Sequence, residues 1–185
     1  MKKILQIALV LILISCEQAM EEPYETFFIP SGKHDNGMKI QSLQTKTLKF
    51  SAIFNETAIY ETQTLENQED INKLMGFSDC NSHHHKNSAR FGWRWLNNQL
   101  EIHAYAYANG ERITEYIGSV KLNEPYDYQI QLTNDAYVFY LEGLDPVRIT
   151  RKSPCTRGLY YMLFPYFGGN EVAPHDMTIQ ILTKY

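Results

Sequence analysis

Basic residues are too few in this sequence to form a strongly positive surface. Lys and Arg number 17 against 21 Asp and Glu, which gives a formal net charge of −4 over 185 residues. Nucleic-acid binding depends on a basic surface that displaces counterions, so we expect no nucleic-acid partner. A Gly-rich phosphate loop followed by a helix, a serine-nucleophile elbow and a Walker-type lysine are also missing, so nothing indicates nucleotide chemistry.

Internal repeats and linkers rich in Pro, Gly or Ser are missing as well. A length of 185 residues suits one domain. Hydrophobic residues make up 44% of the chain and aromatic residues 13%, which is enough apolar surface to bury a core. We therefore expect one folded domain over residues 24–185.

Only one long apolar run occurs, and it lies at the start of the chain. It covers residues 4–14, follows two lysines and contains a single Gln. About eleven residues cannot cross a bilayer core as a helix, so the run indicates an export signal and not an anchor. Its end, Leu13-Ile14-Ser15-Cys16, resembles the lipobox of bacterial lipoproteins. The resemblance implies that residues 1–15 are a signal peptide and that Cys16 is lipidated; the alternative is an ordinary secretory leader.

Residues 16–23 form a short acidic tether after this signal. Lipid chains on Cys16 would attach the domain to a membrane without embedding it. The acidic tether is similar to segments that send some lipoproteins to the outer face of the outer membrane. We therefore expect an outer-membrane lipoprotein at the cell surface, with the periplasmic face as the open alternative.

Cysteine is scarce, with three residues in all. If Cys16 carries lipid, Cys80 and Cys155 are left in an oxidising compartment, where a pair commonly forms a disulfide. Such a bridge would close a loop of about 75 residues and stabilise the fold by several kcal/mol. Two separately buried thiols are the open alternative.

Helical signals are also rare. One short helix is predicted over residues 67–75, because acidic residues come early in this segment, Lys73 comes late and Gly76 follows as a stop. Strands are predicted from Phe, Ile and Tyr content or from alternation over residues 24–29, 47–55, 58–62, 159–166 and 177–182.

Two-residue turns fix the strand register in the middle of the chain. A turn at Asn97-Asn98 gives one apolar and one polar face, which a one-residue slip would destroy. It pairs Trp95 with Leu100, Trp93 with Ile102, Phe91 with Ala104, Arg94 with Glu101, Gly92 with His103, and Arg90 with Tyr105.

The next turn, Asn109-Gly110, extends this sheet by a third strand. It pairs Tyr107 with Arg112, Tyr105 with Thr114, His103 with Tyr116, Ala106 with Ile113, and Ile102 with Ile117. Glu115 then falls on the apolar face, which indicates a bulge or a register error.

A third turn, Asn134-Asp135, pairs Leu132 with Tyr137, Ile130 with Phe139, and Tyr128 with Leu141. Many short strands with alternating faces predict an all-β fold, an antiparallel β-sandwich or jelly roll with one short helix.

The polar face of the first two hairpins is rich in Tyr, Arg and His, whereas a merely solvated face favours Lys, Glu, Thr and Ser. Sugars present apolar C–H faces that can lie on Tyr, and a carboxylate can bind Arg through two hydrogen bonds. The sequence therefore favours a polysaccharide or oligosaccharide ligand, possibly acidic. The predicted ligand-binding residues are Arg90, Arg94, Glu101, His103, Tyr105, Tyr107, Arg112 and Tyr116.

The order of three segments resembles the concanavalin A-like lectin/glucanase superfamily, and distantly its alginate-lyase-type polysaccharide lyases. The segments are residues 90–94 (Arg-Phe-Gly-Trp-Arg), 101–103 (Glu-Ile-His) and 160–169, and one last strand follows them. The resemblance implies a jelly roll with a ligand groove across its concave sheet. In a lyase, Arg94 would neutralise a uronate carboxylate and His103 would abstract the neighbouring proton. Tyr161 or Tyr166 would then protonate the leaving oxygen.

Two positions depart from the lyase pattern, so binding without turnover is favoured and elimination is the alternative. Glu101 stands in place of an amide, and Gly92 in place of a Glu. A glycoside hydrolase would need two carboxylates on this face, where only Glu101 lies unless Glu115 joins it. A further alternative is a structural or accessory lipoprotein whose aromatic face binds a protein partner.

The segment 79–85 ends in three consecutive histidines. His83 and His85 share a side in an extended chain and could bind zinc, copper or nickel, completed by Asp79 or by His175-Asp176. The spacing matches no recognised site, and three consecutive His residues are not expected to face one ion. We therefore expect a polar loop, without a metal or another cofactor.

Overall fold

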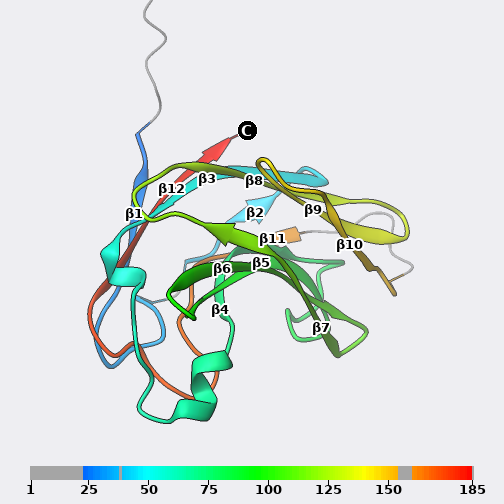
Figure 1. The fold of residues 1–185 in the computed structure, drawn as a ribbon. Coiled ribbons are helices and arrows are strands. Elements are labelled where there is room, and N and C mark those ends of the chain that lie inside the picture. The colour runs from blue at the N-terminus through cyan, green and yellow to red at the C-terminus, as the bar shows by residue number, and fades with distance from the viewer. Residues whose placement is uncertain (1–22, 38, 154–159, 185) are drawn as a thin grey trace, which may run out of the picture.

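The computed structural model describes residues 23–37, 39–153 and 160–184, which form two six-stranded antiparallel sheets (Figure 1). Sheet A contains, from edge to edge, β1 (Glu25–Ile29), β12 (Met177–Lys184), β3 (Thr47–Phe54), β8 (Tyr126–Leu132), β9 (Ala136–Leu141) and β10 (Val147–Thr150). Sheet B contains β2 (Ser42–Leu43), β11 (Tyr160–Leu163), β4 (Asn72–Ser78), β5 (Asn87–Leu96), β6 (Gln99–Ala108) and β7 (Glu111–Val120).

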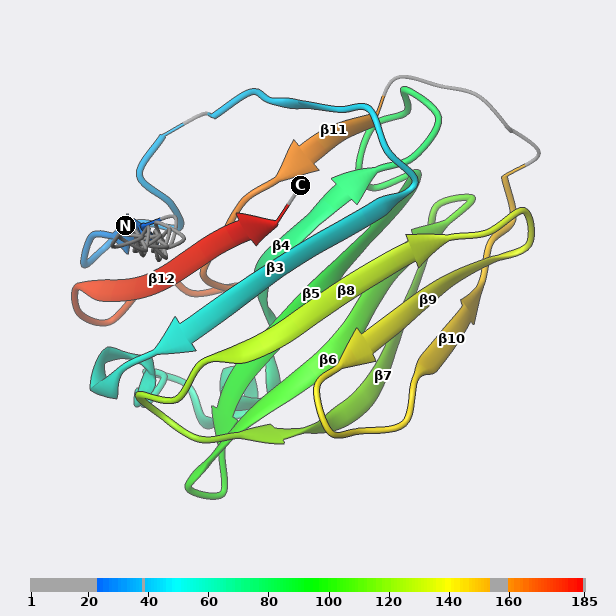
Figure 2. The same cartoon turned by 90° about the horizontal axis from the view of Figure 1, so that it is seen from above.

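The two sheets lie face to face as a sandwich, with sheet A above sheet B in Figure 1 and in front of it in Figure 2. Alternate side chains of each strand point into the space between the sheets. At its centre Phe91 of sheet B meets Phe50, Tyr128 and Phe139 of sheet A, with ring centroids 5.0–5.9 Å apart. These rings are fully buried, and the predicted antiparallel sandwich is confirmed.

The predicted registers of β5 with β6 and of β8 with β9 are confirmed at every pair. Asn97 and Asn98 both have positive φ, as a two-residue hairpin turn of this type requires. β6 pairs with β7 as predicted only as far as His103, and the register then shifts so that Ile102 lies opposite Gly118 and not Ile117. This irregularity is a bulge, and Glu115 is exposed on the edge strand.

The helix predicted over residues 67–75 is wrong. Only a 3-10 turn, η2 (Leu65–Glu69), lies in that region, and β4 begins at Asn72. Leu74 and Phe77 bury their side chains in the core, so tertiary packing decides in favour of a strand. Gly76 is not a helix stop, because a Cβ there would lie 2.1 Å from the carbonyl oxygen of Ala89; it allows β4 to approach β5 closely.

The strand predicted over residues 58–62 is also wrong. Ala58 ends a second 3-10 turn, η1 (Glu56–Ala58), and the following residues belong to no strand. The buried Tyr60 ring packs edge-on against Trp93 and Phe167, so the segment contributes to the core through this side chain. The apolar residues of this segment thus correctly indicated that it is buried, but the strand predicted from them does not form.

Several predictions concern residues outside the described ones. The signal peptide, Cys16, most of the tether and Cys155 lie there, so the lipid anchor and the disulfide stay predictions. Cys80 follows β4, and its Sγ lies 3.0 Å from Oγ of Ser153. Among the described residues, no helix has the length and apolar character needed to span a membrane.

Candidate functional site

The predicted ligand-binding residues come together on the outer face of sheet B, the surface that points away from sheet A. Phe91 and Trp93 of β5 point into the core, so Arg90 and Arg94 point outward. Strand pairing then sets Arg90 beside Tyr105, which faces Thr114 of β7. Along the same strands Gly92 lies beside His103, which faces the half-exposed Tyr116.

The side chain of Glu101 bonds those of both Arg94 and His103. One carboxylate oxygen of Glu101 accepts from Nε of Arg94 at 2.7 Å and lies 3.1 Å from Nε2 of His103. Arg94 also donates to the carbonyl of Glu69 at 2.8 Å. His103 is almost inaccessible, and burial lowers its pKa although the hydrogen bond to Glu101 opposes this shift. Because Arg94 is neutralised by Glu101, it has little charge to offer a carboxylate ligand.

Lys73, which the sequence analysis did not include, lies at the centre of this face. Its Nζ is 5.3 Å from the ring centroid of Tyr105 and 5.9 Å from that of Tyr166, and it donates to the carbonyl of Gly168 at 2.5 Å. Its backbone also bonds that of Tyr166 in both directions, at 2.8 and 3.0 Å. Burial lowers the pKa of Lys73 to about 8, and the charge of Arg90 adds to this effect. Because residues 67–75 were predicted to form a helix, Lys73 was not placed on this face of the sheet.

Arg90 is the second cation at the centre. It is 8% exposed, and one terminal nitrogen donates to the carbonyl of Phe164 at 2.9 Å. Its Nε is buried and has no hydrogen-bond partner among the described residues. Burial lowers the pKa of Arg90 to about 10, which still leaves it charged at neutral pH.

Three cations on this face lack a carboxylate partner. Within the described part of the chain, no Asp or Glu oxygen lies within 4 Å of a charged nitrogen of Lys73, Arg90 or Arg112. Arg112 is exposed on β7, where it pairs with Tyr107. We call Lys73, Arg90 and Arg112 the cationic centre. An anion bound here would replace missing counter-charges, and such hydrogen bonds are stronger than neutral ones.

Tyrosines surround the cationic centre. The rings of Tyr105 and Tyr107 are 6.0 Å apart. Burial raises the pKa of Tyr105 to about 12, with a further contribution from Tyr107, so its hydroxyl stays a donor at neutral pH. Tyr166 stacks on His34 at 5.0 Å, and burial raises its pKa as well. Tyr161, in contrast, donates its hydroxyl to the carbonyl of Ser82, so the structure favours Tyr166 over Tyr161 as a group facing a ligand.

A polar cavity of about 200 Å³ opens beside the cationic centre. It is lined by Glu69, Asp70, Ile71, Lys73, Arg94, Tyr105, Arg112, Thr114 and Gly169. Gly169 leaves room for the Asp70 carboxylate, because a Cβ at residue 169 would lie 2.2 Å from one of its oxygens and would force that side chain to move. A larger depression of about 640 Å³ lies elsewhere, along β2, β3 and the end of β12, and contains none of the predicted site residues.

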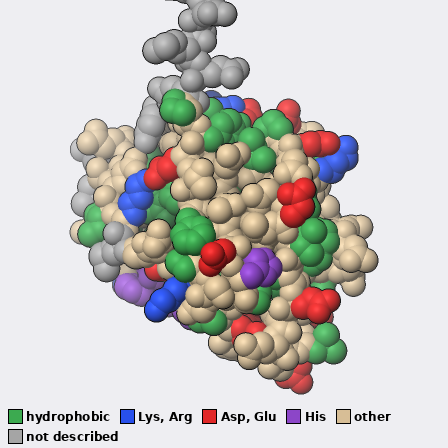
Figure 3. Space-filling view, turned by 90° about the vertical axis from the view of Figure 1, so that its left-hand side faces the viewer, with side chains coloured by type: hydrophobic (Ala, Val, Ile, Leu, Met, Phe, Trp, Pro, Cys, Tyr) green, Lys and Arg blue, Asp and Glu red, His purple; other side chains and the backbone are tan. Residues whose placement is uncertain are grey.

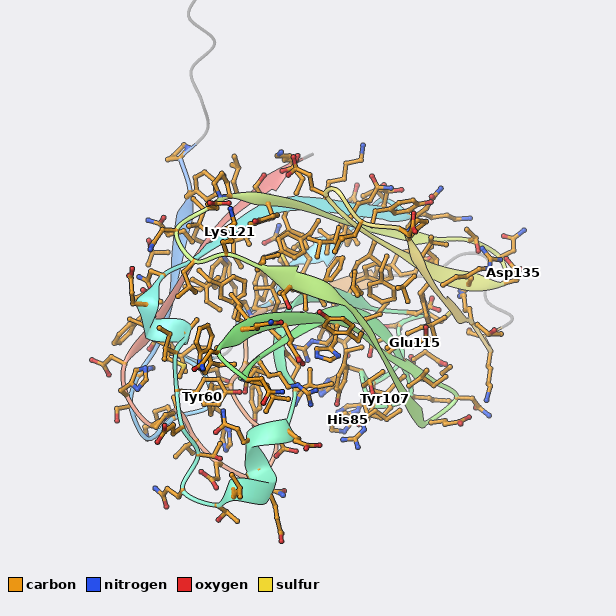
Figure 4. All side chains as sticks on the ribbon, viewed as in Figure 1. Tyr60, His85, Tyr107, Glu115, Lys121 and Asp135 are labelled. Carbon is orange, nitrogen blue, oxygen red and sulfur yellow. The ribbon has the colours of Figure 1, made fainter. Side chains whose placement is uncertain are left out.

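The three histidines lie in the turn between β4 and β5, at the end of the same face. Figure 4 shows His85 next to Tyr107 below sheet B, and their ring centroids are 5.1 Å apart. Each histidine offers one ring nitrogen, and the three nitrogens lie within 4.8 Å of one another. The expectation that three consecutive His residues cannot face one point is therefore wrong, because the chain turns here and is not extended.

Exposed apolar residues bear on the protein-partner alternative. The most exposed large ones are Ile40, in the segment before β2, and Leu65, at the start of η2, and they are 81% and 86% accessible. On the surface seen in Figure 3, hydrophobic side chains form separate small groups among polar and charged ones. This view therefore offers no single broad apolar patch for a partner.

Comparison with known proteins places the fold. No family model matches the sequence, and no curated protein matches it. The alginate lyase AlyC3 superposes with a TM-score of 0.62 and 11% identity, over 87% of this chain and 74% of the lyase. A structure reported with endo-acting O-glycanases of human gut bacteria that initiate mucin breakdown gives 0.54 and 13%, over 89% and 81%. The family GH16 glucanase SCLam gives 0.53 and 10%, over 76% and 57%.

These similarities show a fold, at identities of 10–13%. The fold is the concanavalin A-like jelly roll, which alginate lyases and GH16 glucanases share, and the resemblance inferred from the sequence is confirmed at this level.

Proposed function

We propose that the outer face of sheet B binds an acidic polysaccharide, whose carboxylates pair with the cationic centre. The observation that carries this proposal is the grouping of Lys73, Arg90 and Arg112 around Tyr105 without a carboxylate partner among the described residues. A buried cation without a counter-ion is costly, and a ligand carboxylate would offset that cost.

The tyrosines support a sugar as the carrier of the anion. Tyr105, Tyr107 and Tyr166 present aromatic rings that can pack on the C–H face of a pyranose, and hydroxyls that can bond its oxygens. The acidic residues Glu69 and Asp70 at the cavity can accept from sugar hydroxyls. A structure of alginate lyase AlyC3, which is similar in fold, shows that enzyme in complex with dimannuronate, an acidic disaccharide.

A second candidate is β-elimination on the same polymer, with binding as its first step. Tyr166 beside Lys73 provides the observation in its favour, since elimination needs a base for the proton next to the carboxylate and an acid for the leaving oxygen. The pKa of Lys73, about 8, suits such a base. The predicted pair of Arg94 and His103 suits it less, because both are bonded to Glu101.

Affinity electrophoresis tests the proposal. The protein is run through gels that contain alginate, polygalacturonate or a neutral glucan, beside the variants Lys73→Met and Lys121→Met. Lys121 is an exposed lysine that lies away from Tyr107 in Figure 4 and serves as the matched control. We expect retardation by an acidic polymer only, lost in Lys73→Met and kept in Lys121→Met. Retardation by no polymer would refute binding and favour the protein-partner alternative, whereas release of unsaturated ends from a polymer would establish elimination.

We also propose that lipid on Cys16 holds the domain at the outer membrane, on the cell surface. The lipobox-like end of the apolar run supports this location. The variant Cys16→Ala should move the protein from the membrane fraction to the soluble fraction, and protease added to intact cells should digest the native protein. A variant that still fractionates with membranes would refute the anchor.

A further inference from the structure

We propose that His83, His84 and His85 bind one divalent transition-metal ion. Their ring nitrogens already lie within 4.8 Å of one another. Metal–nitrogen bonds of about 2.0–2.1 Å place two nitrogens on one ion roughly 3–4 Å apart. Closing the site therefore requires the three rings to rotate toward one another.

The turn between β4 and β5 explains how neighbouring residues can share one ion. The carbonyl of His83 accepts from the backbone N–H of Lys86 at 2.7 Å and of Asn87 at 3.3 Å, which closes a tight turn. Oγ of Ser88 donates to the carbonyl of His84 at 2.7 Å and anchors the turn to β5. In a turn, successive side chains do not alternate between opposite sides as they do in a strand. Ring centroids of successive histidines are accordingly only 4.3 Å apart.

One hydrogen bond within the cluster would change on binding. The backbone N–H of His85 donates to Nδ1 of His83 at 3.2 Å, which holds the His83 ring over the turn. An ion bound at Nδ1 would replace this long bond, and an ion at Nε2 would require a proton on Nδ1. Either change removes one weak neutral hydrogen bond, which is small beside three metal–nitrogen bonds.

The donor set identifies the class of ion. Imidazole nitrogen suits Zn²⁺, Cu²⁺ and Ni²⁺, whereas Ca²⁺ and Mg²⁺ need several oxygen ligands. The cluster contains no carboxylate. Asp79 cannot complete it as the sequence analysis considered, because both its oxygens bond Arg151 and one also accepts from Tyr137. Water would take the remaining positions, as in sites with three protein ligands.

The surroundings limit the affinity. His85 lies beside Tyr107, and the charges of Arg90 and Lys73 reach it strongly enough to lower its pKa, after the larger effect of burial. The same charges oppose a cation. We therefore expect weaker binding than in an enclosed zinc site.

Calorimetric titration of the full, untagged protein with Zn²⁺ tests this site. We expect one equivalent to bind, and the variants His84→Asn and His85→Asn each to lower the affinity at least about tenfold, since losing even a group that only supports a metal ligand costs that much. His175→Asn is the matched control, because the His175 ring bonds the carbonyl of Thr57 and lies outside the cluster. Mg²⁺ should not compete with Zn²⁺.

A second measurement guards against misfolding of the variants. Zn²⁺ should raise the melting temperature of the wild-type protein and of His175→Asn, and leave that of His84→Asn and His85→Asn unchanged. Each protein is compared with itself without metal. No binding, binding of several equivalents, or binding that both cluster variants retain would overturn the proposal. Because these assays contain no polysaccharide, their result is independent of the proposed glycan binding.

Discussion

If an acidic glycan binds at the cationic centre as proposed, the ammonium group of Lys73 should make its affinity depend on pH, and this dependence can be calculated. Burial lowers its pKa to about 8 in the ligand-free protein, so the group loses its charge in a range where surface lysines keep theirs. A neutral amine cannot pair with a carboxylate. Affinity for an acidic polymer should therefore fall as pH rises through 8, to about one tenth between pH 7 and pH 9.

The other groups on this face with a shifted pKa keep their charge state in this window. Burial lowers the pKa of His103, that of His84 to about 4, and that of His85 as well, so these rings are neutral throughout. Tyr105, with its pKa of about 12, stays protonated, and Arg90, at about 10, stays largely charged. A loss of affinity between pH 7 and pH 9 thus reports on Lys73.

Two variants separate the effect of the positive charge of Lys73 from that of the shape of its side chain. Lys73→Met should weaken binding about 10- to 100-fold at pH 7, because a hydrogen bond to a charged group contributes about 1.5–3 kcal/mol. Lys73→Arg should bind at pH 7 and lose the pH dependence, since guanidinium stays charged. Calorimetry with an oligouronate at pH 7, 8 and 9 measures both effects. Equal affinity at all three pH values in the wild-type protein would refute the role given to Lys73.

The stability of the free protein should change in the opposite direction. Because the folded state lowers the pKa of Lys73 below its unfolded value of 10.5, the unfolded chain binds more protons between about pH 8 and pH 10.5. This group therefore makes the folded state more stable as pH rises through that window. Weaker glycan binding at pH 9 would then not be caused by unfolding. Urea denaturation at each pH measures the free energy of unfolding and checks this.

Further predictions concern the fold itself. Gly76→Ala should destabilise the protein by about 1–3 kcal/mol in urea denaturation, because the new Cβ meets the backbone of β5; an unchanged midpoint would contradict the close approach. Arg151→Met should cost about 3–5 kcal/mol, because it leaves the fully buried Asp79 without its counter-ion; a loss below about 1 kcal/mol would show that water reaches the carboxylate. Mass spectrometry of the mature, oxidised protein should find Cys80 and Cys155 linked, and two free thiols would rule the bridge out.

Local signals predicted the central hairpins well. Asn97-Asn98 and Asn109-Gly110 tolerate the positive φ that such turns require, and the alternation of apolar side chains then leaves one register. The bulge opposite Ile102 could not be predicted in the same way. It lies between Ile102 and His103 beside the edge strand β7, and its position is not encoded in any single pair of residues.

The helix prediction for β4 failed because one of its two partner strands, β11, lies far away in sequence. The acidic residues before β4 fit a helix start, and Lys73 and Gly76 fit a helix end, yet Lys73 and Gly76 serve different purposes in a strand between β5 and β11. Lys73 faces the site, and Gly76 permits a close backbone approach. Because of the helix prediction, Lys73 was not among the predicted site residues. The neighbouring Arg90 and Tyr105 were correctly placed on one face.

The interactions of charged groups were the other feature that register could not predict. Alternation placed Arg94, Glu101 and His103 on the outer face, but only side-chain geometry shows that they bond each other. For this reason we propose the cationic centre, and not Arg94, as the place where an anion would bind. The histidine cluster was likewise assessed as an extended chain, and the direction of the turn reverses that assessment.

An NMR titration of the isotope-labelled protein with an oligouronate tests the central claim most directly. We expect the largest shift changes on β4 to β7, around Lys73, Arg90, Tyr105 and Arg112, while sheet A stays unchanged. A neutral oligosaccharide of the same length should cause much smaller changes. Changes centred on sheet A, or none with the acidic ligand at millimolar concentration, would contradict the assignment of this face as an acidic-glycan site.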